Sequence, residues 1–77
     1  MGDFVAKYLL ELARRIDRPR PGKIRYILAK LSASLQGADT YVRQAVSTQL
    51  MRLKARVKSK KIRKVLSRRA RTVLQPV

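Results

Sequence analysis

The sequence contains neither cysteine nor histidine, and only four of its 77 residues are acidic. Without cysteine there can be no disulfide and no thiolate metal site, and without histidine the commonest metal ligand and general base is missing. The four carboxylates are too scattered to suggest an acid–base pair or a metal site, and the three isolated glycines form no phosphate-binding loop. We therefore expect no enzymatic activity, no cofactor and no small-molecule substrate.

Tryptophan is also missing, and no uncharged run approaches the roughly 20 residues that a transmembrane helix needs. The N-terminus lacks the basic region and apolar stretch of a secretory signal. Residues 60–74 contain no aromatic residue, which argues against binding to a membrane surface. The expected location is the cytoplasm, the nucleoid or the interior of a virus particle, and secretion is not expected.

Positive charge is what the sequence has in abundance. Twenty Lys and Arg residues against four Asp and Glu give a net charge of +16. Hydrophobic residues make up 45% of the chain, which is ordinary for a protein that folds and too much for a simple disordered basic tail. In so small a body the cations repel one another and destabilise the compact state. The combination predicts a polyanionic partner.

The charge is sorted along the chain. Residues 1–17 are neutral overall, residues 18–40 carry +4, and residues 41–77 carry +12 with no acidic residue. This division suggests a neutral N-terminal part that serves folding or assembly and a C-terminal part that binds phosphates.

The apolar residues recur at helical spacing, so the expected fold is all-α. We expect a small bundle, one domain over all 77 residues, of two amphipathic helices followed by a long, highly basic C-terminal helix that is continuous, bent or broken. The neutral segment 1–17 is expected to form the first helix, from about Asp3 to Ile16 with Asp3 as its N-cap, and the second helix is expected at residues 23–36. The basic Pro-rich linker 18–22 separates them because proline cannot continue a helix, and Gly37 follows the second helix as its C′ residue.

The basic helical segment, residues 39–75, is expected to begin at a cap formed by Asp39 or Thr40. Its apolar residues before and after residues 58–61 lie on nearly opposite sides of a continuous helix. Two explanations stay open. The helix bends or breaks at residues 58–61 in a monomer, or it continues and meets different partners in an assembly.

The strongest candidate site is a cluster of eight cations within fourteen residues of this segment: Lys58, Lys60, Lys61, Arg63, Lys64, Arg68, Arg69 and Arg71. If all eight contact phosphates of duplex DNA, the slope of log K against log[salt] should be about −7. A second candidate set lies in and after the proline-rich linker, which could follow a groove or a backbone as basic arms do: Arg18, Arg20, Lys23 and Arg25.

The four aromatic residues divide into two groups. Phe4 and Tyr8 lie on or beside the apolar stripe of the neutral helix and are expected in the core or in an interface. Tyr26 and Tyr41 adjoin arginines and could touch a sugar or a phosphate. Because no aromatic residue follows Tyr41, the basic segment itself favours contact with phosphates over stacking on unpaired bases.

These features predict a structural protein that coats, packages or compacts nucleic acid, with duplex DNA favoured over RNA. It would act in many copies, with homo-oligomer contacts through apolar helix faces. One alternative is a helix–turn–helix DNA-binding regulator, because the short connection at residues 35–39 contains glycine. Its candidate base-contacting residues are Tyr41, Arg43, Gln44, Ser47 and Thr48. A further alternative is a small ribosomal or ribonucleoprotein subunit.

Overall fold

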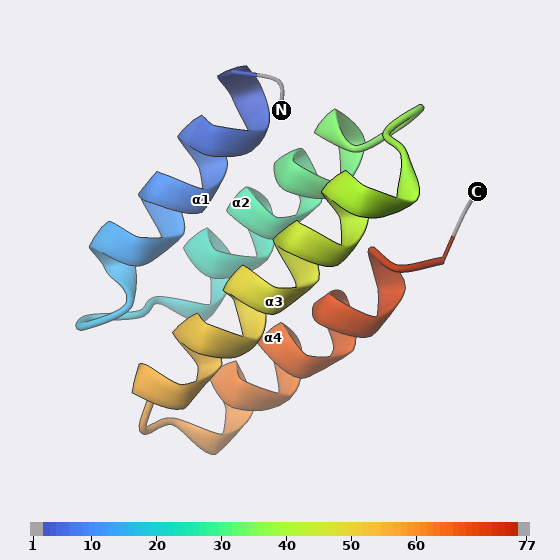
Figure 1. Cartoon of the computed structure of the whole chain (residues 1–77). Helices are drawn as coiled ribbons and strands as arrows, with labels where there is room; N and C mark the ends of the chain where they lie inside the picture. The colour runs from blue at the N-terminus through green and yellow to red at the C-terminus, as the bar shows by residue number, and fades with distance from the viewer. Residues whose placement is uncertain (1–2, 76–77) are drawn as a thin grey trace.

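The computed structural model describes residues 3–75, and within this range it confirms the all-α prediction (Figure 1). The chain forms four helices: α1 Asp3–Arg15, α2 Pro21–Ser34, α3 Thr40–Arg56 and α4 Lys60–Thr72. The first two residues of the neutral segment 1–17 lie outside the described residues, and Asp3 lies within the first turn of α1.

The prediction of one long C-terminal helix is wrong, because the chain leaves the helix after Arg56 and starts a new one at Lys60. Val57 adopts an extended conformation, with φ −90° and ψ 132°, and Ser59 caps α4 by accepting a hydrogen bond from the Ile62 amide at 3.4 Å. The break coincides with the point where the apolar stripe changes sides. Folding back at this point lets both stripes face one core, which a straight helix could not do within a single chain.

The connection between α1 and α2 lies slightly earlier in the chain than the sequence suggested. Helix α2 begins at Pro21, two residues before the predicted start. Proline suits the first turn of a helix, because the amide it lacks would have no partner there. The Ile24 amide then donates to the Arg20 carbonyl at 2.9 Å, which closes the first turn of α2.

In the turn between α2 and α3 the predicted cap at Asp39 is confirmed, whereas Gly37 is not the C′ residue, because the C-cap of α2 is Leu35 and Gly37 lies one position further along the chain. Gly37 has φ +78°, in the left-handed region that glycine adopts without strain, and it follows the end of α2. Asp39 caps α3, because its carboxylate accepts a hydrogen bond from the Val42 amide at 2.9 Å. The turn therefore reverses the chain, and backbone groups at the end of α2 and at the start of α3 have hydrogen-bond partners.

Replacing Gly37 by alanine should lower the free energy of unfolding by about 1 kcal/mol, because alanine is strained at positive φ. Gly22 provides a matched control: it lies inside α2, and an added Cβ there meets no atom within 4 Å. Gly22→Ala should raise the stability by about 0.5 kcal/mol. Urea unfolding of the two variants measures both values, and equal effects would contradict the role assigned to Gly37.

The four helices form two stacked hairpins (Figure 1). Helices α1 and α2 pair in one layer and α3 and α4 pair in the other, with α1 lying against α3 and α2 against α4. The radius of gyration is 11.3 Å and the principal extents are 31 × 20 × 18 Å. The chain thus has two opposite outer faces, one on each hairpin.

The core takes up the apolar stripes of all four helices. Leu12, Leu28, Leu50 and Leu66 are fully buried, one from each helix. The other apolar residues at helical spacing are also buried or pack against this core: Val5, Leu9, Ile16, Ile24, Ile27, Leu31, Leu35, Val42, Val46, Leu53, Val57, Ile62, Val65 and Val73. Tyr8 also packs against the core, whereas Phe4 is 64% exposed and is not a core residue. The predicted stripes therefore cover one another within one chain.

Candidate nucleic-acid interface

The outer face of α4 is strongly basic. Ile62 and Leu66 point into the core, so the residues on the opposite side of the same helix face solvent. Six of the predicted cations are exposed there: Lys60, Lys61, Arg63, Lys64, Arg68 and Arg71. The amphipathic pattern of α4 is therefore an apolar inner side and a cationic outer side.

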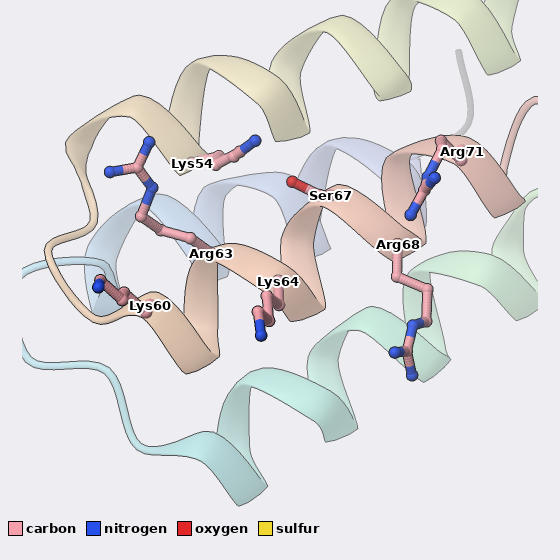
Figure 2. Close-up of a pocket in the computed structure, with 7 residues that line it drawn as sticks. All are labelled: Lys54, Lys60, Arg63, Lys64, Ser67, Arg68 and Arg71. Atoms are coloured by element: carbon pink, nitrogen blue, oxygen red, sulfur yellow. The ribbon is translucent and has the colours of Figure 1, made fainter.

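A concavity of about 630 Å³ lies between α3 and α4, and we call it the α3–α4 groove (Figure 2). It is lined by Lys54, Lys60, Arg63, Lys64, Ser67, Arg68 and Arg71. In Figure 2 the side chain of Lys54 extends from α3 over the groove, and the other labelled residues belong to α4. Six cations thus surround one concavity, and none of the described residues that line it is acidic.

Lys54 was not among the predicted site residues. It is only partly exposed and lies near the C-terminal end of α3. Its contribution depends on the packing of α3 beside α4, which places it across from the α4 cations. Sequence spacing alone carried no signal for it.

A second concavity, of about 470 Å³, lies on the other side of α4 and is shared with α2. Arg25 lines it together with Arg68, so the structure brings one cation of the second candidate set to the α4 face. Arg69 also lines this concavity, but it is half-buried and donates a hydrogen bond from Nη1 to Ser32 Oγ at 2.9 Å. Arg69 therefore links α4 to α2 and is less available to a partner than the exposed α4 cations.

The remaining linker cations do not join the α3–α4 groove. Arg18 and Arg20 are exposed in the α1–α2 connection. This connection lies at the same end of the bundle as Lys58, where a hollow of about 340 Å³ is lined by residues of both connections. Lys23 lies on the α1–α2 face instead, with its Nζ 6.0 Å from the centroid of the Tyr26 ring.

The candidate base-contacting residues of α3 differ in how far they are exposed to solvent. Tyr41, Gln44 and Thr48 are exposed and line a shallow hollow of about 310 Å³ on the outer face of α3. Arg43 and Ser47 are only 8% and 9% exposed, so they cannot reach a base edge in this conformation. This corrects the prediction for these two residues.

Arg43 is held by main-chain carbonyls at the ends of two other helices. Its Nη2 donates to the Leu35 carbonyl at 2.8 Å, and its Nε donates to the Ala38 carbonyl at 3.1 Å. Its Nη1 donates to the carbonyls of Val73 at 3.2 Å and Gln75 at 3.5 Å. The guanidinium thus joins the carbonyl-rich ends of α2 and α4, where cations are favoured.

Ser47 has a similar structural role one turn further along α3. Its Oγ donates to the Ala70 carbonyl of α4 at 2.8 Å. The sequence did contain a signal for both residues. Arg43 precedes Val46 by three positions and Ser47 by four, which places both polar side chains at the edge of the apolar stripe of α3.

None of the acidic residues that the structure describes lines the α3–α4 groove. Glu11 pairs with Arg15 at 3.6 Å within α1, and Asp17 pairs with Arg56 at 3.8 Å across the two connections. No group of three or more metal-ligating side chains occurs within residues 3–75. Among the helices described, none combines the length and apolar content needed to cross a bilayer.

Comparisons with protein-family models, with curated proteins and with solved structures found no match to this chain.

Proposed function

We propose that the protein is a structural nucleic-acid-binding protein that coats, packages or compacts its partner through phosphate contacts with little sequence preference. One observation carries the proposal: six cations surround the α3–α4 groove, and no acidic side chain among the lining residues competes for them. Phosphate contacts supply most of the sequence-independent affinity of such proteins. Duplex DNA is the favoured partner, since no aromatic ring lines the groove to stack with unpaired bases.

A helix–turn–helix regulator is the second candidate. The exposed Tyr41, Gln44 and Thr48 favour it, since uncharged polar side chains on a helix after a glycine-containing turn could contact base edges. The burial of Arg43 weighs against it, because arginine gives the commonest specific contact with guanine. A ribonucleoprotein subunit, the third candidate, differs from the first in preferring RNA.

A salt titration of binding tests the proposal. The ligands are a random DNA duplex, an RNA duplex, single strands and a pool enriched by selection. If the six groove cations contact phosphates, the slope of log K against log[salt] on duplex DNA should be about −5, with similar affinity for unrelated sequences.

Three other results of this titration would favour different conclusions. A selected sequence that binds about 10³-fold more tightly than random duplex would support the helix–turn–helix regulator. A strong preference for RNA would support the ribonucleoprotein subunit. Binding that does not change with salt would contradict a phosphate-contacting groove.

A further inference from the structure

The layer formed by α1 and α2 carries a further cationic concavity, on the hairpin that faces away from the α3–α4 groove. Its volume is about 220 Å³, and it is lined by Lys7, Tyr8, Glu11, Arg15, Lys23, Tyr26 and Ile27. We call it the Tyr26 site. Unlike the α3–α4 groove, it combines cations with aromatic rings.

Ammonium groups surround the tyrosines of this site. The Nζ atoms of Lys23 and Lys30 lie 6.0 and 5.6 Å from the centroid of the Tyr26 ring, and the Nζ of Lys7 lies 5.8 Å from that of Tyr8. Tyr26 is 57% exposed, so much of its ring is open to a ligand. Glu11 is the one acidic residue in the lining, and it pairs with Arg15 rather than with the lysines.

We propose that the Tyr26 site binds an unpaired stretch of nucleic acid, with one base stacked on the Tyr26 ring and the flanking phosphates contacted by Lys23 and Lys30. An exposed cation–π contact is weaker than the stacking of a base on an aromatic ring. A base can therefore displace the ammonium groups from the ring. The displaced lysines are left beside the phosphates of the same strand.

Single strands fit this site better than a duplex. A base inside a duplex is already stacked on its neighbours, so its face is not open to the ring of Tyr26. The inference rests on the proposed function only in that the partner is nucleic acid. The side chains that would contact the single strand lie on the other hairpin and are not those of the α3–α4 groove. One molecule could then hold a duplex on the α3–α4 layer and a single strand on the α1–α2 layer.

The test compares Tyr26→Ala with Met51→Ala in the full chain. Met51 is the control: it is a large apolar side chain, 45% exposed on α3, and it lines neither the Tyr26 site nor the α3–α4 groove. The probes are an oligothymidine of about 20 nucleotides and a duplex of the same length, in salt of about 0.3 M, where phosphate contacts are weakened and stacking persists.

Tyr26→Ala should bind the oligothymidine about tenfold more weakly and the duplex as the unsubstituted chain does. Tyr26→Phe should retain the single-strand affinity, because the ring is kept, and Met51→Ala should change neither affinity. An equal loss on both probes, or no loss on either, would overturn the Tyr26 site.

The duplex probe separates this inference from the proposed function. If the unsubstituted chain binds the duplex normally and fails to bind the oligothymidine, the Tyr26 site is overturned and the proposed function stands. If it binds neither probe even at low salt, the proposed function is overturned as well.

Discussion

A variant in which four α4 cations are replaced by glutamine should bind random duplex DNA about a thousandfold more weakly at roughly 0.1 M salt. The substituted residues are Lys60, Lys64, Arg68 and Arg71, which line the α3–α4 groove and are exposed. Each lost phosphate contact leaves about one counterion on the DNA, so the slope of log K against log[salt] should also flatten by about 3.6. Fluorescence anisotropy at several salt concentrations measures both quantities.

The control for this variant separates the position of the charges from their number. Lys64→Gln with Arg68→Gln removes two charges from the groove, and Arg14→Gln with Arg52→Gln removes two exposed charges elsewhere. The first pair should weaken binding far more than the second. Equal losses would mean that the net charge of +16, rather than the α3–α4 groove, determines affinity.

Arg43→Met should lower the free energy of unfolding by about 3 kcal/mol, a large share of the stability of a domain this size. The substitution removes the guanidinium that donates to carbonyls at the ends of α2 and α4. Those carbonyls then lose their partner in a partly buried position. The midpoint of thermal unfolding should fall by about 15 °C, which circular dichroism can follow.

Two further variants define the role of Arg43. Arg43→Lys should restore little of the stability, because a single ammonium group cannot span carbonyls that the planar guanidinium joins. Gln44→Met, next to it and exposed, should leave stability nearly unchanged. If Arg43→Met stayed fully stable but lost sequence-selective DNA binding, the assignment of Arg43 to the structure rather than to base contact would be wrong.

Most of the fold follows from apolar spacing. The stripes that the spacing predicts are the ones that pack in the core, and Gly37 and Asp39 mark the turn between α2 and α3 for reasons visible in the sequence. The number of helices did not follow from the apolar spacing. A stripe that changes sides at residues 58–61 fits both a broken helix and a continuous one with several partners. Only the mutual burial of the stripes within one chain decides between them.

The candidate site was predictable as a region but not as a set of atoms. Local charge density in the sequence picks out α4, and its helical period gives the exposed side. Whether a cation is exposed or held depends on residues distant in sequence. Arg69 is held by Ser32, 37 positions away, and Arg43 by Val73, 30 positions away. Lys54 likewise joins the groove only through the pairing of α3 with α4.

The inward orientation of all four apolar stripes has a consequence for stoichiometry. Copies whose apolar stripes are all buried would bind along a polymer through attraction between opposite charges. Their binding should therefore show little cooperativity between neighbouring copies. The molecule is 31 Å long, and a duplex of that length has about nine base pairs and carries about 18 phosphate charges. One copy brings +16, so a fully covered duplex would be almost electrically neutral, the condition under which DNA loses its self-repulsion and condenses.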